Sequence, residues 1–525
     1  MGGIGQRGFL RVAKARHEDL NLARRGVAVG AAVLAALLGG CGGSDDPSLA
    51  QTSGVQVSAA TAASSPFIGH VRLVNASVQD IASVAVTVEP KSGATAAPAH
   101  YTYQSSYIAR RGWADAAQGQ LALPVPALYA GTTNHVDLHV AFRDGSATDL
   151  AASIDTPAYV DLGGIYDHPV AHVPRDASLQ PGFSYFFMKT HSGSPIVVDV
   201  DGQVRWSLPS TLNSQSSIFT DNGFVVGDPT TVSLVRMELD GSVQTTPIES
   251  GHEYINIHHN IDAGKRAMFV SLDAESNGQK NLESVFAEVS PSGAVLKQWD
   301  MAQILSDYMR SQGDDPSNFV RPGIDWFHQN ATAYDPSDDS IIVSSRENFL
   351  IKIDYASGSI KWILGDPSQY WAQYASLRAK SLVLGAGGLS PLGQHAVSVV
   401  GKNQVMVFND GTPSIEPPAG WTVGPARTYS AVSSYAVDPE QGTATETGRF
   451  DYVRSLYSAF CSSAYRTSNG GMLISYAAVG GGTHTRLVGL DPQQRVAFDY
   501  EYVNRANCDT SWNAQVIPLE ALTFQ

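Results

Sequence analysis

The fold is decided by the stretch DWFHQNATAYDPSDDSIIVSSRENFLIKIDYASGSIKWILGD, residues 325–366. It contains the short runs ATAY, IIVSS, FLIKID and IKWIL, and the turn sequences DPSDD and ASGS interrupt them. Runs of this kind, bounded by turn residues, predict antiparallel strands. We therefore expect His328 and Arg346 to lie on adjacent strands of one sheet. An imidazole and a guanidinium placed in this way suit a tetrahedral oxyanion such as sulfate or phosphate.

Similar groups of strands recur from about residue 176 onward. Each group ends in two strands joined by a turn, and these turns read DVDGQV, ELDGSV, SPSGAV, YASGSI and DPQQRV. A repeat of roughly 40–70 residues with about four strands is typical of a β-propeller. Since six repeats fill the available length, we predict a six-bladed β-propeller over residues 176–525. Helical inserts are expected at 300–312 and 370–384.

Residues 55–175 have a different pattern. The runs HVRLVNA, SVAVTVEP, QLALPVP and HVDLHVAF are short, alternate in polarity and are spaced by turn residues, which predicts a small β-sandwich. No cluster of His, Cys and carboxylate residues occurs in this part, so we interpret it as an accessory or dimerisation domain, with a homodimer as one option. The predicted fold class is all-β, a β-sandwich followed by a β-propeller.

Charge and motifs exclude several classes of function. The formal net charge of −15 argues against a nucleic-acid partner, because proteins that bind nucleic acids carry basic patches. An acidic protein can still hold an anionic small molecule in a local cationic pocket. The motifs HExxH, CxxC, GxSxG and the Walker loop do not occur, so neither a metal nor a cofactor is expected.

The N-terminus is typical of an exported protein. Basic residues precede the uncharged run GVAVGAAVLAALLGG at 26–40, which has the length of a signal peptide and is short for a membrane-spanning helix. The run ends in LGGC, similar to a bacterial lipoprotein box in which Cys41 is lipidated; an ordinary signal peptide with a chance cysteine is the alternative. We expect a signal peptide at 1–40 and a flexible tether at 41–54. Gly42 favours a cell-envelope lipoprotein of the periplasm anchored to the outer membrane.

The two remaining cysteines are Cys461 and Cys508. In an oxidising compartment an even pair of cysteines predicts a disulfide. Two separate buried thiols are the alternative.

Histidines begin the first strand of three repeats, in IHHNID (His258 and His259), FHQNAT (His328) and QHAVSV (His395). The innermost strand of every propeller blade lines the central channel, so these residues are expected to converge, unless each is a structural histidine. His258 and His259 cannot both face the channel, and the shared pattern HxN favours His258. Asn330 shares a face with His328. Three histidines around one axis could instead hold zinc.

These residues resemble the bacterial arylsulfate sulfotransferases that do not use phosphoadenosine phosphosulfate (PAPS). The resemblance rests on DWFHQN together with SSRENFLIKIDYASGSIKWILGD, on Trp299-Asp300 before the predicted helix, on Trp371, and on GQHAV leading into VMVFNDG. It covers residues from about 180 to 510. The segment LYAGTTNHVDLHV in the N-terminal domain is similar in kind.

The resemblance implies a transferase that moves a sulfuryl group from an aryl sulfate to a phenol through a sulfohistidine, in a ping-pong cycle. By motif, His395 corresponds to the nucleophile. Sulfate binding and proton transfer would fall to His258 or His259, His328, Asn330 and Arg346. Aromatic residues expected at the pocket mouth, to stack on phenols, are Trp326, Phe327 and Trp371.

One departure from the family keeps other functions open. Members of the family can carry a disulfide just upstream of the nucleophilic histidine, whereas the segment SLVLGAGGLSPLGQ before His395 has no cysteine. A non-catalytic β-propeller lipoprotein that binds a ligand or acts as a scaffold is the main alternative. A quinoprotein-like or metal-dependent enzyme that uses the same channel is the second.

Overall fold

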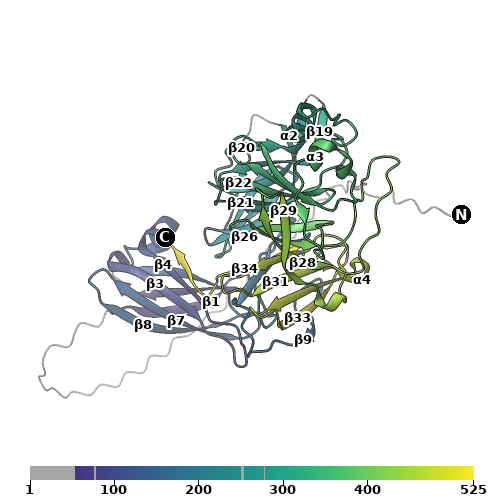
Figure 1. The fold of residues 1–525 in the computed structure, drawn as a ribbon. Coiled ribbons are helices and arrows are strands. Elements are labelled where there is room, and N and C mark those ends of the chain that lie inside the picture. The colour runs from purple at the N-terminus through teal and green to yellow at the C-terminus, as the bar shows by residue number, and fades with distance from the viewer. Residues whose placement is uncertain (1–53, 76–77, 250–252, 277) are drawn as a thin grey trace, which may run out of the picture. The chain divides into compact units, whose positions relative to one another are not determined.

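The computed structural model describes residues 54–525, except for 76–77, 250–252 and 277. The predicted signal peptide, Cys41, nearly all of the tether and His252 lie outside these described residues. Strands dominate the described chain, and its helices are short (Figure 1). Among the described residues, no helix has the length and apolar character that crossing a membrane requires. The prediction of an all-β protein is confirmed.

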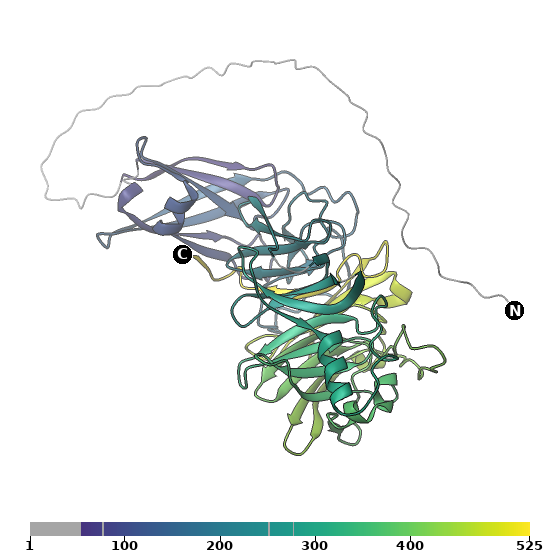
Figure 2. The ribbon, with the colours of Figure 1, turned by 90° about the horizontal axis from the view of Figure 1, so that it is seen from above.

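Two sheets form the N-terminal part of the described chain (Figure 2). One has the order β1 (Gln56–Ala62), β2 (Ile68–Val74), β6 (Gln120–Pro126), β5 (Ala114–Asp115). The other has the order β35 (Leu522–Phe524), β4 (Ala99–Gln104), β3 (Ile81–Val88), β7 (Thr133–Phe142), β8 (Ala147–Asp155). Buried residues of both sheets, such as Val71 and Val86, share one hydrophobic core. This is the expected β-sandwich, and helix α1 (Ser105–Arg111) follows β4.

Six further sheets follow in the described chain, each built on four antiparallel strands. The first two consist of β10 (Tyr185–Lys189), β11 (Ile196–Asp199), β12 (Val204–Trp206) and β34 (Asn513–Ile517), and of β13 (Ser217–Thr220), β14 (Gly223–Asp228), β15 (Ser233–Glu238) and β16 (Val243–Pro247). The next two consist of β17 (Glu253–Ala263), β18 (Met268–Ser276), β19 (Gln279–Val289) and β20 (Val295–Asp300), and of β21 (Gln329–Asp335), β22 (Ser340–Ser345), β23 (Phe349–Asp354) and β24 (Ile360–Gly365). The last two consist of β26 (Gln394–Gly401), β27 (Gln404–Asn409), β28 (Ala431–Asp438), β29 (Thr443–Phe450) and β25 (Val383–Leu384), and of β30 (Ser463–Arg466), β31 (Met472–Ala478), β32 (His484–Leu490), β33 (Val496–Val503) and β9 (Val170–Val173).

One strand of each of these sheets borders a common channel. A cavity of about 700 Å³ is lined by residues of β13, β17, β21, β26, β30 and β34. Representative lining residues, one per strand, are Phe219, Ile261, Ala333, Val397, Tyr465 and Gln515. The sheets are therefore arranged around an axis as in a β-propeller, and equivalent positions on their inner strands come together.

Three strands pair far from their neighbours in sequence. The inner strand β34 comes from the C-terminal end of the chain and pairs with β10, which closes the ring of sheets. Strand β9 joins the sheet of β33, and β35 pairs in parallel with β4 of the sandwich. The predicted domain boundary between residues 175 and 176 stays a prediction. Strand β9 precedes it and pairs with β33, which follows it, and strand β35 follows it and pairs with β4, which precedes it.

Glycine in tight turns explains the repeated pattern read from the sequence. Gly241 and Gly293 have φ of 89° and 84°, a region that L-residues with a side chain rarely adopt. A Cβ atom on Gly293 would lie 2.0 Å from the carbonyl oxygen of Pro247. Both glycines sit between the third and fourth strands of a sheet, where the sequence predicted a hairpin.

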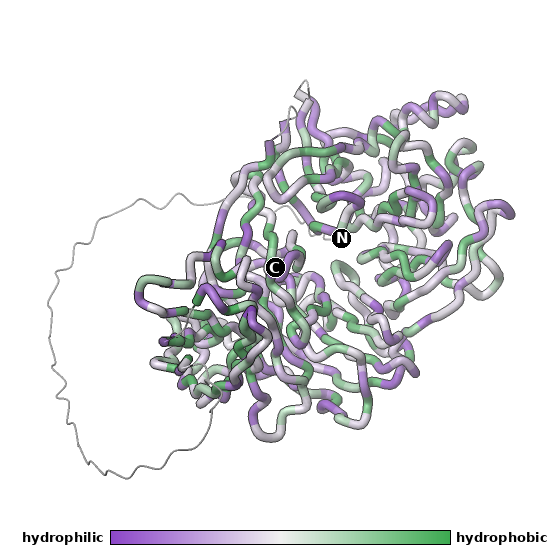
Figure 3. Tube along the Cα trace, turned by 90° about the vertical axis from the view of Figure 1, so that its left-hand side faces the viewer, coloured by the Kyte–Doolittle hydropathy of each residue, from purple (hydrophilic) through white to green (hydrophobic). Residues whose placement is uncertain are grey.

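The two predicted helical inserts turn out differently. Helix α2 (Met301–Ser311) begins where expected, because the Asp300 side chain accepts hydrogen bonds from the backbone N–H groups of Ala302 and Gln303. The prediction of one continuous helix over 370–384 is wrong. This segment forms the 3₁₀ turn η2 (Tyr370–Gln373) and the short helix α3 (Ala375–Arg378), which the extended residue Tyr374 separates. Hydrophobic and hydrophilic segments alternate along the chain (Figure 3), as a protein with several hydrophobic cores requires.

Candidate active site

His328 and Arg346 are neighbours at the end of one hairpin. His328 directly precedes β21 and Arg346 directly follows β22, and the backbone N–H of Arg346 donates to the His328 carbonyl at 3.1 Å. His328 has a φ of 54°, and the pairing of β21 with β22 shifts between Gln329 and Ala331. This bulge re-aims the histidine side chain at the start of the strand. The two residues therefore flank the ends of adjacent strands, whereas the prediction placed them on the strands themselves.

Arg346 offers unused hydrogen-bond donors inside the protein. The residue is only 2% exposed, and its Nη1 donates to Glu347 Oε1 at 2.6 Å. Its Nε and Nη2 groups have no partner among the described residues. Glu347 is held in turn by the backbone N–H groups of Ile415 and Glu416 at 2.9 and 3.0 Å. Because buried N–H groups are rarely left unpaired, the geometry fits an anion bound at the open side of the guanidinium.

His395 is held in a single tautomer on β26. Its Nδ1 lies 3.1 Å from the Gly393 carbonyl, which accepts its hydrogen bond, and 3.0 Å from Asp410 Oδ2. The proton therefore resides on Nδ1, and the lone pair of Nε2 is free. Burial, together with the charges of His328 and Arg346, holds the pKa of His395 well below its ordinary value. The imidazole is consequently neutral and nucleophilic at neutral pH.

The structure distinguishes between the two adjacent histidines of β17. His259 Nε2 lies 3.1 Å from His328 Nε2, whereas His258 lies behind His259, with an Nδ1–Nδ1 distance of 2.9 Å. The HxN comparison had favoured His258, and it is wrong on this point. The pairing of β17 with β18 is irregular between Ile257 and Ile261, which shifts the inward-facing position by one residue.

Two carboxylates surround the outer nitrogen of His328. Its Nδ1 lies 2.5 Å from Asp325 Oδ2 and 3.0 Å from Glu283 Oε2. Burial alone would lower the pKa of His328, but the charges of Glu283 and Asp325 and their hydrogen bonds outweigh it and raise the pKa well above its ordinary value. Burial and the neighbouring His328 lower the pKa of His259 well below its ordinary value. The pair thus consists of a cationic His328 beside a neutral His259.

Asn330 belongs to a chain of hydrogen bonds that joins the inner strands. Its Nδ2 donates to the Gln394 carbonyl at 2.8 Å, and its own carbonyl accepts from Asn260 Nδ2 at 2.9 Å. Lys189 Nζ extends the chain by donating to Asn260 Oδ1 at 2.8 Å. The amide oxygen of Asn330 has no partner among the described residues. Asn330 therefore ties strands β21 and β26 together.

The aromatic residues expected at a pocket mouth lie in the hydrophobic core. Trp326, Phe327 and Trp371 are exposed by 2%, 0% and 1%, and they pack in the cluster that also contains Phe349. Trp326 is too well packed to open a face to a ligand, since Phe319 lies 5.3 Å and Phe327 5.2 Å from it between ring centroids. The prediction that these three side chains line a pocket mouth is therefore wrong, because all three are buried.

Two other aromatic rings face the site. Trp512 is half-buried, and its ring centroid lies 5.0 Å from the His259 ring and 6.3 Å from the His395 ring. Phe460 is also half-buried, and the guanidinium carbon of Arg346 lies 5.6 Å from its ring centroid. Nothing in the sequence marked these two residues, because neither belongs to the first strand of a repeat.

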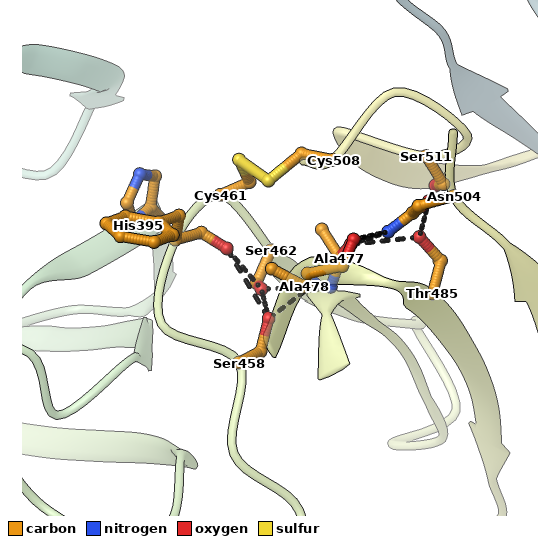
Figure 4. Close-up of a disulfide and its surroundings, with 12 residues drawn as sticks. His395, Ser458, Cys461, Ser462, Ala477, Ala478, Thr485, Asn504, Cys508 and Ser511 are labelled. Carbon is orange, nitrogen blue, oxygen red and sulfur yellow. Dashed lines mark hydrogen bonds between the residues drawn. A yellow bond between two sulfur atoms is a disulfide. The ribbon is translucent and has the colours of Figure 1, made fainter. Parts of the chain in front are cut away.

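The predicted disulfide between Cys461 and Cys508 is present. It joins the segments that carry Phe460 and Trp512, and the Ser462 backbone N–H donates to the Trp512 carbonyl at 3.1 Å. Figure 4 shows this disulfide with the hydrogen bonds around it and with His395 in the same view. The cross-link therefore fixes two chain segments that border the histidines.

Potential cation-binding groups overlap the histidine cluster. His258, His259 and Glu283 form one group of close ligand atoms, and Glu283, Asp325 and His328 form another. His328 Nδ1 is hydrogen-bonded to Asp325 Oδ2 and His259 to two imidazoles, whereas His258 Nε2 and Glu283 Oε2 have no hydrogen-bond partner among the described residues. The three histidines His258, His328 and His395 that could have held zinc do not form such a group among the described residues.

Comparison with known proteins places the chain in a family. The family model described as Arylsulfotransferase (ASST) matches residues 173–513, which include every residue of the site and the strands of the propeller except most of β9 and β34. The chain belongs to the arylsulfotransferase family.

Relatives of known name share part of this region. An arylsulfate sulfotransferase, AssT, from Escherichia coli O6:H1 is 26% identical over 211 residues, which are 32% of this chain and 34% of the relative. A second, AssT from Lelliottia amnigena, is 27% identical over 199 residues, 30% of this chain and 32% of the relative. The chain thus matches about a third of the length of these relatives.

Two solved structures are similar to part of the chain at low TM-score. The Cps50 (Swd1) β-propeller domain of Myceliophteria thermophila has a TM-score of 0.29 and 10% identity, over 64% of this chain and 96% of that one. The computationally designed Ika8 protein has a TM-score of 0.30 and 13% identity, over 63% of this chain and 92% of that one. The fold assignment rests on the sheets of the protein itself.

Proposed function

We propose that the protein transfers a sulfuryl group from an aryl sulfate to a phenol, through a covalent intermediate on His395. The observation that carries this proposal is the buried guanidinium of Arg346, whose Nε and Nη2 groups lack partners among the described residues. Its charge acts on a neutral His395 whose Nε2 lone pair is free. Membership of the arylsulfotransferase family supports the same reaction.

In the first half of the reaction, Nε2 of His395 forms a bond to sulfur while the bond from sulfur to the phenolic oxygen breaks. Arg346 stabilises the charge on the sulfuryl oxygens. Because an ordinary phenol has a pKa of about 10, its anion leaves readily only when it receives a proton. The cationic His328 supplies that proton and becomes neutral.

In the second half, the acceptor phenol gives its proton to the neutral His328, and the phenolic oxygen attacks sulfur. The bond between Nε2 and sulfur breaks, and His395 returns to its neutral form. The Gly393 carbonyl at Nδ1, together with the carboxylate form of Asp410 that this charge favours, stabilises the positive charge that the ring carries while Nε2 is sulfonated. The donor supplies the sulfuryl group, so the cycle needs no cofactor.

Aromatic substrates fit the two half-buried rings at the site. Trp512 lies against the rings of His259 and His395, and Phe460 lies over the Arg346 guanidinium. A phenyl ring that stacks beside either of them would bring its sulfate group toward the arginine.

A transfer assay tests the proposal. Purified protein with p-nitrophenyl sulfate and phenol is expected to release p-nitrophenol, and His395→Ala is expected to lower the rate by at least about 10³-fold, because the covalent step is lost. The exposed residue His70 gives a matched control, and His70→Ala should keep full activity. If no donor and acceptor in a broad panel react, the protein is the non-catalytic ligand binder that shares this fold.

We also propose that the protein is exported and held in the cell envelope by a lipid on Cys41. The disulfide between Cys461 and Cys508 supports an oxidising compartment. Replacing Cys41 by Ser should move the protein from the membrane fraction to the soluble fraction of the envelope. An unchanged distribution would contradict the lipid anchor.

A further inference from the structure

We propose that Glu283 and Asp325 form a carboxylate pair that keeps His328 in its acid form and aimed at the leaving oxygen, and that this pair lets the protein use aryl sulfates of weakly acidic phenols. The inference rests on the proposed sulfuryl transfer and assigns positioning residues to it. No sequence motif assigns a role to Glu283. Asp325 is close to the site in sequence, because it lies three residues before His328.

The geometry assigns each nitrogen of His328 a separate task. Nδ1 faces Asp325 Oδ2 at 2.5 Å and Glu283 Oε2 at 3.0 Å, so this nitrogen carries a proton. Nε2 faces His259 Nε2 at 3.1 Å. Since His259 is neutral, its Nε2 accepts and the His328 Nε2–H donates. An imidazolium with its outer N–H held by two carboxylates can release only the inner proton toward the site.

The two carboxylates come from different elements and are fixed independently. Glu283 lies on β19, and its backbone N–H donates to Asp273 Oδ1 at 2.7 Å. Asp325 lies in the segment before β21. Their side chains are 22% and 28% exposed, and that of His328 is 15% exposed. All three side chains are therefore partly open to solvent, with which His328 can exchange protons between turnovers.

The charges that face His328 decide its protonation. Glu283 and Asp325 face it from one side, and neutral His259 faces it from the other. Arg346 and Asp410 lie further around the same centre. The pKa of His328 is raised well above its ordinary value, so the acid form persists at neutral pH and is lost only as the pH rises through that raised pKa. Removing a carboxylate lowers this pKa, and the loss of the acid form moves to lower pH.

Proton balance links the pair to the choice of donor. When the bond from sulfur to oxygen breaks, the Nε2 proton of His328 passes to the phenolate oxygen, and the Nδ1 proton stays between the carboxylates. A phenol of low pKa leaves as a stable anion and gains little from this proton. A phenol of pKa about 10 depends on it, and general acid catalysis is typically worth 10²–10⁴-fold.

The test compares a series of substituted phenyl sulfates, from p-nitrophenyl sulfate to unsubstituted phenyl sulfate, with one phenol acceptor. Glu283→Gln, Asp325→Asn and the double variant keep the side-chain shapes and remove the charges. We expect kcat/KM to fall less than about tenfold for p-nitrophenyl sulfate and about 10²-fold or more for phenyl sulfate. The alkaline limb of the pH profile should move to lower pH. Asp307→Asn, which removes an exposed carboxylate from α2, serves as the control.

A second readout does not depend on turnover. Titration of the His328 ring by NMR should show a lower pKa in both single variants than in the unsubstituted protein. Equal losses for all donors together with an unchanged His328 titration would overturn the inference and leave the proposed function standing. Absence of transfer by the unsubstituted protein would overturn the proposed function, and this inference with it.

Discussion

Two histidines of this site, His395 and His328, have opposite ionisation states. His395 is held neutral by burial, by the charged His328 and by Arg346, whereas the carboxylates around His328 keep that ring charged. A nucleophile must be unprotonated and a general acid protonated at the same pH. The proposed mechanism therefore uses each of the two imidazoles in the ionisation state that its surroundings favour.

Replacement of Asp410 is expected to lower the transfer activity and, as the pH rises, to increase the relative stability of the protein. It is fully buried beside His395 Nδ1, and burial raises its pKa well above the ordinary value, although Arg346 and His328 oppose the shift. A carboxyl group with a raised pKa in the folded state stabilises the protein below its unfolded pKa, and this contribution is lost as the pH rises through the folded pKa. Asp410→Asn should therefore gain stability relative to the unsubstituted protein as the pH rises.

The same variant should lose transfer activity by about 10²-fold, because the positive charge of the sulfonated ring favours the carboxylate form of Asp410, which an amide cannot supply. Melting temperature from pH 5 to 9 and kcat with p-nitrophenyl sulfate measure the two effects. A variant that is less stable at high pH, or that keeps full activity, would contradict this role of Asp410.

Some site residues were predictable from the sequence, and others were not. His328, His395 and Arg346 were found because they occupy fixed places in recurring strands. Glu283 was not, since it lies on β19, in a different sheet from the strand that follows His328, and no motif surrounds it; only the contact between β19 and β21 brings the two residues together. Asp410 stands in VMVFNDG, and its position after a strand could have marked it.

At the scale of elements, bulges decide which side chains enter the site. His259 and His328 both have positive φ, at 51° and 54°, near irregular positions of their strands. The comparison of HxN in two repeats assumed the same register in both. The bulges differ by one residue, and side chains alternate between faces along a strand, so the prediction selected His258 instead of His259.

The disulfide is the element-scale feature with the clearest energetic effect. Cys461 and Cys508 are 47 residues apart, and closing such a loop stabilises the folded state by about 4 kcal/mol in the chain-entropy model. The double variant Cys461→Ser, Cys508→Ser should lose stability of this order in urea unfolding. Its KM for aryl sulfates should rise, because the segments carrying Phe460 and Trp512 are no longer joined.

A reducing agent offers the matched control for this prediction. The reducing agent should lower the stability of the unsubstituted protein in urea unfolding and raise its KM. It should change neither quantity in the double variant. Equal stability and equal KM in both proteins would show that the cross-link has no part in the site.

At the scale of the whole molecule, local patterns predicted the architecture and long-range pairing completed it. The recurring turns with glycine indicated strands grouped around an axis, and the inner strands do line one channel. The sequence could not show that β34 pairs with β10 or that β35 pairs with β4, because these partners lie hundreds of residues apart and share no local signal. Such pairings depend on the packing of the whole chain.

The central claim is that His395 carries the sulfuryl group between donor and acceptor. The most direct measurement is mass spectrometry of the protein after exposure to p-nitrophenyl sulfate without an acceptor. The account predicts a mass gain of one sulfuryl group on the peptide that contains His395, and its loss when phenol is added. An unmodified His395 in a protein that transfers sulfuryl groups would contradict the account.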